Sequence, residues 1–178
     1  MNTMYLDRPR DKNPPFYLSL GMNGLRLNNC MLDSGASANV ISLKVMKQLG
    51  LKTTRPYGNV YGIDSRRVEV LGVCEDVEVF LIDFPHISVL MDILVIDVPD
   101  AWGMLLSRAW SSALGGFLSM DLTHAYIPMG DGTYEILHNR EKKDTHVMNL
   151  RGPNYVSEHY HDMPPQVIEY DPSELPFM

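Results

Sequence analysis

The sequence predicts an all-β fold class, mainly strands with two short helices, because of three patterns. Many short stretches alternate apolar with polar residues, as strands with one buried face do. Turn signals separate these stretches, and Asn23-Gly24 is the strongest because both residues accept positive φ. Helical spacing follows Ser42 and Ser107, and glycine ends each of these stretches. The patterns indicate a small closed or folded-over β architecture.

The predicted elements are short and closely spaced. The first hairpin turns at Asn23-Gly24, and a second hairpin with a flexible tip lies between Tyr57 and Leu71. One helix is expected within Ile41 to Leu51, with Ser42 as N-cap and Gly50 as the stop, and the other runs from its N-cap Ser107 through Leu114. Strands are expected, in chain order, at residues 16–20, 25–32, 73–82, 90–98, 118–122, 125–127 and 133–137.

Composition divides the 178 residues into three parts. Residues 1–14 are polar, charged and contain proline, so we expect an N-terminal arm. Residues 15–140 hold the periodic stretches and form the predicted domain. Residues 141–178 carry several prolines and acidic side chains without an apolar period, which predicts a disordered linker or tail.

The net charge and the distribution of apolar residues argue against binding to nucleic acid or to a membrane. The net charge is −7, from 15 basic and 22 acidic residues, whereas nucleic-acid binding needs clustered Lys and Arg. The N-terminus has no signal-peptide pattern, and the most apolar region, residues 87–98, is interrupted by Asp92 and Asp97. We therefore expect a cytoplasmic protein that binds neither nucleic acid nor a membrane. A piece of a longer polyprotein would give the same pattern.

The residue types favour neither a metal ion nor another cofactor. Cys30 and Cys74 are too few for a zinc site or a disulfide scaffold, so we expect two buried, reduced thiols. His159 and His161 lie in the tail without further ligands at suitable spacing. The sequence also lacks the Gly-x-Ser-x-Gly pattern of a serine nucleophile.

The segment of residues 31–40 joins an apolar strand to an acidic turn. The strand delivers Asp33 to a turn of Ser34, Gly35 and Ala36, none of which is bulky. A carboxylate in such a place can approach another backbone or a ligand closely. Gly35 lets the chain bend and present amide hydrogens to the carboxylate, and Ser34 offers a short hydroxyl.

Together with three later features, this turn resembles the retropepsin-like aspartic proteases, among them those of plant Ty3/gypsy-type retrotransposons. The later features are a Gly-rich region around Gly62 and Ile63, the apolar strand at 90–98 and the segment 102–108. That segment is similar to the apolar-apolar-Gly-Arg segment of the family. Asp-Ser-Gly alone also occurs in ordinary turns. The resemblance therefore rests on all four features in order, within residues 15–139.

The resemblance implies that Asp33 is the catalytic carboxylate and that two such groups act on one water molecule. The chain has a single Asp-Ser-Gly, whereas a two-lobed enzyme needs two such turns. We therefore expect a retropepsin-like half-barrel that forms a C2 homodimer, in which the Asp33 side chains of both subunits meet at the axis.

The resemblance also implies roles for the neighbouring residues. Ser34 would lock the two turns across the axis, and the Gly35 amide would bond a carboxylate. Ala36 would line the floor of the substrate groove. Gly62 and Ile63 would lie near the tip of a flap that closes over the peptide.

Arg108 would support the active-site loop from behind. Ser37 stands where many members of the family have aspartate, and Ser107 stands where they often have glycine. Without that aspartate the Asp–Arg pair beneath the loop cannot form, so Arg108 would bond Ser37 or backbone carbonyls.

The predicted function is that of an aspartic endopeptidase, a hydrolase that is active only as a dimer. Its substrate would be an extended polypeptide, such as a retroelement polyprotein. The alternative is a catalytically silent module of the same fold that dimerises or binds a peptide as an added strand.

Overall fold

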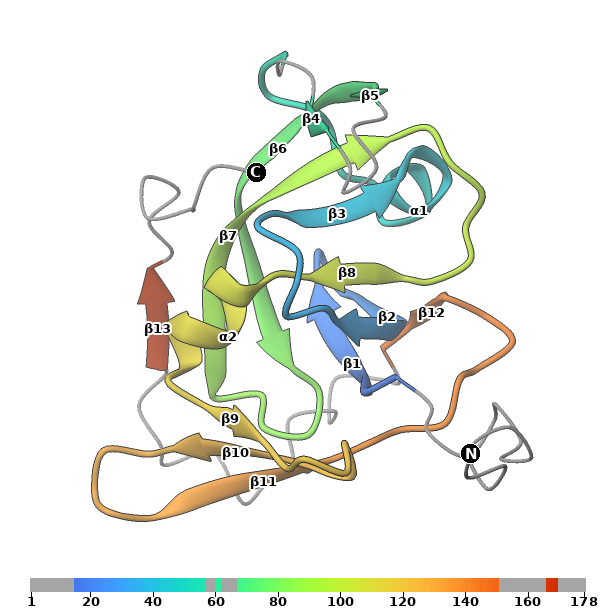
Figure 1. Cartoon of the computed structure of the whole chain (residues 1–178). Helices are drawn as coiled ribbons and strands as arrows, with labels where there is room; N and C mark the ends of the chain where they lie inside the picture. Colours follow the sequence, from blue (N-terminus) through green and yellow to red (C-terminus); the bar gives the residue numbers. More distant parts are fainter. Residues whose placement is uncertain (1–14, 57–59, 62–66, 151–165, 170–178) are drawn as a thin grey trace, which may run out of the picture.

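The computed structural model describes residues 15–56, 60–61, 67–150 and 166–169 (Figure 1). Strands dominate these residues, and two short helices, α1 (Leu43–Gln48) and α2 (Arg108–Leu114), accompany them, which confirms the predicted all-β class. The main sheet contains β1 (Tyr17–Met22), β2 (Leu25–Leu32), β3 (Asn39–Ser42), β6 (Val70–Leu81), β7 (Ile87–Ile96), β8 (Met104–Leu106), β12 (Val147–Asn149) and β13 (Gln166–Glu169). The smaller sheets contain β4 (Val60–Tyr61) with β5 (Arg67–Val68), and β9 (Phe117–Leu118), β10 (His124–Pro128) and β11 (Tyr134–His138).

The main sheet closes on itself. Its order is β1-β6-β7-β3-β8-β2-β12, and β1 also pairs with β2. Apolar side chains fill the interior, where close packing excludes water. Several of them have no exposed surface at all, namely Leu20, Leu27, Ile41, Ile93 and Leu106. The closed sheet therefore encloses the core on which the rest of the chain is built.

The predicted hairpin around Asn23-Gly24 is confirmed. Both turn residues have positive φ, 50° for Asn23 and 73° for Gly24, as a two-residue turn of the I′ kind requires. The register places Tyr17 opposite Met31 and Met22 opposite Leu25. This hairpin carries β2 toward the Asp33 turn.

The two predicted helix starts are also confirmed. The Ser42 hydroxyl accepts a hydrogen bond from the Val45 amide at 3.1 Å, and the Ser107 hydroxyl accepts one from the Trp110 amide at 3.4 Å. Gly115 ends α2 with φ of 65°, a left-handed conformation that glycine adopts without strain.

Several strands differ from the sequence-based prediction. No strand was expected at residues 39–42, where β3 lies, and β7 begins at Ile87 rather than at residue 90. The strand expected at 118–122 ends at Leu118, because the next residues form a turn instead. The Ser119 and Thr123 hydroxyls both donate to the Asp121 carboxylate, at 2.6 and 2.8 Å, and these local bonds compete with strand pairing.

Ordered strands continue past residue 140, in the range where the sequence predicts a tail. β12 pairs with β2, with Val147 opposite Leu27. The Asn29 side chain bonds both the amide and the carbonyl of Lys143, at 2.6 and 2.8 Å. Residues 166–169 form β13, which pairs in parallel with residues 87–90 of β7. Contacts from distant strands therefore order short segments that have no apolar period of their own.

The second predicted hairpin is described in part. β4 and β5 are antiparallel, with residue 60 opposite 68 and residue 61 opposite 67. Gly62 and Ile63, the expected flap residues, lie outside the described residues.

Cys30 and Cys74 are buried and free, as predicted. Burial in apolar surroundings raises the pKa of both thiols above the ordinary value. Within the described ranges, no group of three or more His, Cys, Asp or Glu residues is arranged to hold a metal ion. Neither described helix is long and apolar enough to cross a bilayer.

Substituting Gly103, the residue before β8, should destabilise the fold. A Cβ atom there would lie 2.0 Å from the Asn28 carbonyl oxygen, so β8 and β2 would have to separate. We expect Gly103→Ala to lower the free energy of unfolding in urea by about 2 kcal/mol or more. Gly130→Ala is the control, because its φ of 80° costs about 1 kcal/mol but no atom lies within 4 Å. Equal losses in the two variants would contradict this account.

Candidate active site

Asp33 begins a tight turn directly after β2. Its amide donates to the Leu106 carbonyl at 3.0 Å, and its own carbonyl accepts from the Ala36 amide at 3.0 Å. The Gly35 amide donates to Asp33 Oδ1 at 3.0 Å. The turn therefore orients its own carboxylate, as the sequence analysis expected of Gly35.

The turn reaches the protein surface. Ser34 and Gly35 are exposed, Asp33 and Ala36 are half-buried, and Ser37 is buried. Among the described residues, the Gly35 amide is the one group that donates a hydrogen bond to the Asp33 carboxylate. The carboxylate thus has further acceptor positions for a ligand or for a second protein surface.

Strand β8 holds the turn at both ends. It pairs in parallel with β2, so that Leu32 lies beside Leu106, and Val40 of β3 lies opposite Leu105. The β2 and β3 strands that flank the turn are therefore both bonded to the same short strand. This arrangement limits how far Asp33 can move relative to the core.

Asn39 is a residue of the site that the sequence analysis missed. It is 1% exposed, and its Oδ1 accepts from the Ser107 amide at 3.0 Å. Its Nδ2 donates to the Asp92 carbonyl at 3.2 Å. The side chain thereby connects the end of the turn to the start of α2 and to β7. The sequence does contain one signal of this role, because Asn39 is a polar residue directly before the apolar pair Val40-Ile41. A polar residue next to buried residues often forms buried hydrogen bonds.

The Arg108 guanidinium makes no hydrogen bond or ion pair to the loop among the described residues, whereas the resemblance implies that it bonds Ser37 or backbone carbonyls. The side chain is exposed and has no hydrogen bond or ion pair to any described residue. Arg108 instead supports the turn through its backbone, since its amide donates to the Ala36 carbonyl at 3.0 Å. Ser107 is fully buried as the cap of α2, so serine has a defined role at the position where glycine was expected.

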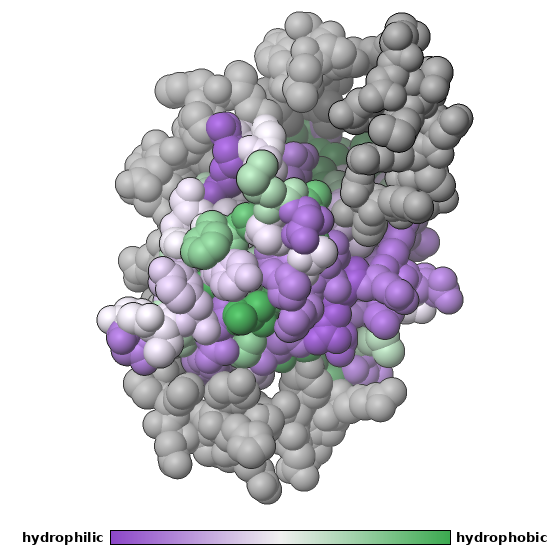
Figure 2. Space-filling view, turned by 60° about the horizontal axis from the view of Figure 1, so that its bottom comes forward, coloured by the Kyte–Doolittle hydropathy of each residue, from purple (hydrophilic) through white to green (hydrophobic). Residues whose placement is uncertain are grey.

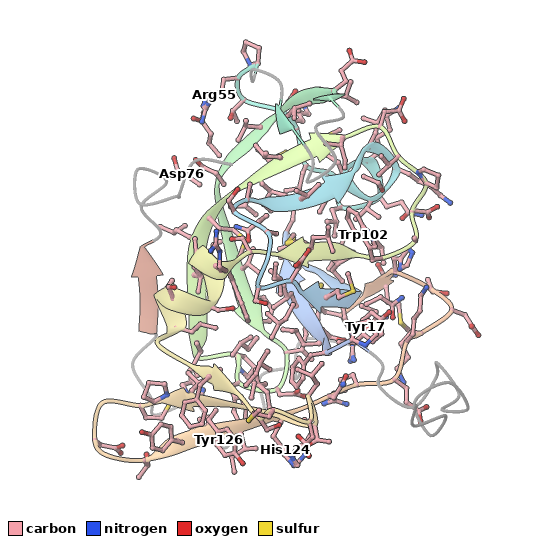
Figure 3. The ribbon with its side chains drawn as sticks, viewed as in Figure 1. Tyr17, Arg55, Asp76, Trp102, His124 and Tyr126 are labelled. Carbon is pink, nitrogen blue, oxygen red and sulfur yellow. The ribbon has the colours of Figure 1, made fainter. Side chains whose placement is uncertain are left out.

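An apolar cavity of about 280 Å³ begins beside the turn. Leu32 and Ser34 are among its lining residues, and residues of α2, β9, β10 and β11 form its other walls. Trp110 is among these residues, and its indole N–H is buried without an acceptor among the described residues. The cavity walls also include Arg108, Leu114, Phe117, Leu118, Ala125, Tyr126, Ile127 and Leu137. Figure 3 shows Tyr126 on β10, at the lower edge of the molecule.

Many solved structures are similar to this chain, among them a protease-like domain and a protease. One is the retroviral protease-like domain of Ddi1 from Leishmania major, at 15% identity and a TM-score of 0.49, which covers 71% of this chain and 99% of that one. The other is the EIAV protease in complex with the inhibitor HBY-793, at 19% identity and a TM-score of 0.49, which covers 63% of this chain and 99% of that one. No protein-family model matches the sequence, and no curated protein matches it either.

Removing the Asn39 side chain should destabilise the frame of the turn. Asn39→Ala leaves the Ser107 amide buried without its acceptor, so we expect a loss of about 2 kcal/mol in the free energy of unfolding. Asn149→Ala, on the exposed side of β12, serves as the matched control and should cost less than about 0.5 kcal/mol. Urea denaturation of both variants measures the difference. An Asn39→Ala protein as stable as the control would show that these bonds do not hold the turn.

Proposed function

We propose that this chain is one subunit of a homodimeric, retropepsin-like aspartic endopeptidase with Asp33 as its catalytic group. The observation that carries the proposal is the placement of Asp33 on an exposed turn that is fixed at both ends. The turn orients the carboxylate through the Gly35 amide and leaves Ser34 exposed beside it. A catalytic carboxylate needs this combination of fixed orientation and access to substrate.

The chemistry requires a second carboxylate, which a second copy of the chain supplies. Two carboxylates about 3 Å apart cannot both ionise, so the pair shares one proton. The ionised partner accepts a proton from water as the water attacks the scissile carbonyl carbon. The protonated partner donates its proton to the carbonyl oxygen. The carboxyl group that took the proton from water then donates it to the nitrogen as the C–N bond breaks, and the other carboxylate takes a proton back from a hydroxyl of the tetrahedral species. The products are a free carboxylic acid and an amine, the pair again shares one proton, and no covalent link to the protein forms.

The neighbouring residues take supporting roles in this proposal. Ser34 lies at the two-fold axis and bonds across it, and Ala36 contacts the peptide backbone. Gly62 and Ile63, which lie outside the described residues, are proposed to bind the substrate peptide. The substrate class is an extended polypeptide, such as the polyprotein of a Ty3/gypsy-type retroelement.

A catalytically silent module of the same fold is the second candidate, and the exposed Arg108 side chain favours it. Among the described residues, the Arg108 guanidinium makes no bond to the turn. The turn therefore depends on backbone hydrogen bonds and on the Asn39 side chain. The two candidates differ in one measurement. A stable dimer without cleavage between about pH 4 and about pH 7 identifies the module.

Replacing Asp33 by asparagine should abolish peptide cleavage and leave assembly intact. The asparagine side chain has nearly the same size but cannot accept the proton from water, so we expect Asp33→Asn to lower the rate at least about 1000-fold. The assay uses the full chain with a peptide library, and sedimentation reports the dimer. Asp97→Asn, at an exposed aspartate beyond β7, is the control and should retain full activity. Cleavage that survives Asp33→Asn would remove Asp33 from the catalytic role.

A further inference from the structure

Large apolar side chains are exposed mainly in one part of the structure. Six such residues stand out among the described ranges, and four of them lie between residues 117 and 136. They are Phe117, Met120, Tyr134 and Ile136, with exposed fractions of 55%, 103%, 53% and 43%. A surface that concentrates exposed apolar groups in this way marks a contact site for another molecule.

The three strands β9, β10 and β11 explain why these side chains face outward together. Ala125 lies opposite Leu137 and Leu118, and these side chains face the core. Because side chains alternate along a strand, the next residue, Tyr126, lies on the other face with its partners Ile136 and Phe117. Phe117, Tyr126, Tyr134 and Ile136 therefore form one outward surface, the aromatic patch.

The aromatic patch is ordered before any partner binds. The rings of Phe117 and Tyr126 stack with centroids 4.9 Å apart and an interplanar angle of 16°. Tyr134 meets Phe117 edge-on at 5.8 Å and 74°. Rings that already fix one another lose little conformational entropy on binding, which is typical of residues that dominate an interface. Figure 2 shows this lower face, where green and pale side chains lie among the hydrophilic ones.

The turn next to the patch carries the exposed Met120 and is held by side-chain hydrogen bonds. The Asp121 carboxylate accepts hydrogen bonds from the hydroxyls of Ser119 and Thr123 and from the Thr123 amide. These bonds, the one from Ser119 first, lower the pKa of Asp121 to about 2. Asp121 therefore stays ionised, and this turn keeps its hydrogen bonds, under the mildly acidic conditions in which an aspartic protease works.

The patch and the Asp33 turn belong to one continuous surface. The same cavity is lined by Leu32 and Ser34 at the turn and by Phe117 and Tyr126 at the patch. The turn alone is too small to hold two subunits, because a stable interface buries about 800 Å² per partner. A dimer that brings two Ser34 residues together must therefore cover neighbouring surface, and the apolar surface that adjoins the turn is the aromatic patch.

We propose that a second copy of this chain docks on the aromatic patch, and that this contact brings the two Asp33 turns together. The inference rests on the proposed function, which requires the second carboxylate. In a C2 dimer the same patch is buried on both subunits, so each substitution acts twice. The patch is thus an assembly surface, on which the completion of the catalytic pair depends.

Phe117→Ser in the full chain tests the proposal by sedimentation at several concentrations. We expect the dimer dissociation constant to rise at least about tenfold, because the change removes the central ring from both subunits. Ile136→Ser should weaken the dimer in the same direction. Leu71→Ser is the matched control, because Leu71 is an exposed strand residue outside the patch, and it should change the constant less than about twofold. Circular dichroism confirms that each variant is folded.

The outcomes separate the inference from the proposed function. If Phe117→Ser and Ile136→Ser keep the dissociation constant of the unmodified chain while that chain cleaves peptides, the patch is not the interface but the function stands. If the two variants dissociate and their cleavage falls in proportion to the dimer lost, both proposals are supported. An unmodified chain that is monomeric at every concentration and cleaves nothing overturns both.

Discussion

The candidate site depends on the pairing of β8 with both strands that flank the Asp33 turn. β2 enters the turn beside β8, and β3 leaves it against the same strand. Bonds from Asp33 to Leu106 and from Arg108 to Ala36 then close the frame on both sides. Because these are backbone bonds between residues that the fold already holds together, the carboxylate is oriented before any ligand arrives.

Local signals explain which parts of this frame could be predicted from the sequence. Asn23-Gly24 specifies its hairpin because both residues accept positive φ, and Ser42 and Ser107 specify helix starts through bonds to residues three positions on. The Asp33 turn is local in the same sense, since its defining bonds join residues two or three apart. A sequence pattern can predict such contacts because both partners lie within it.

The parts that were not predicted depend on contacts between distant residues. Asn39 acts through the backbone of Ser107 and Asp92, far away in the chain, so its role became visible only in the folded structure. β12 is a strand because β2 offers it a free edge, although residues 147–149 carry no strong strand pattern. The Arg108 side chain shows the opposite case, since the resemblance implied a hydrogen bond to the loop that this exposed side chain does not make among the described residues.

A single carboxylate cannot carry out the two proton transfers of peptide hydrolysis, so the central claim concerns the meeting of two copies. The most direct test is the distance between the two Asp33 carboxylates in a crystal structure of the protein with a peptide-like inhibitor. The account predicts a symmetric dimer in which these carboxylates lie about 3 Å apart beneath the inhibitor. A dimer that holds the two carboxylates on separate faces, or an inhibitor bound elsewhere, would contradict it.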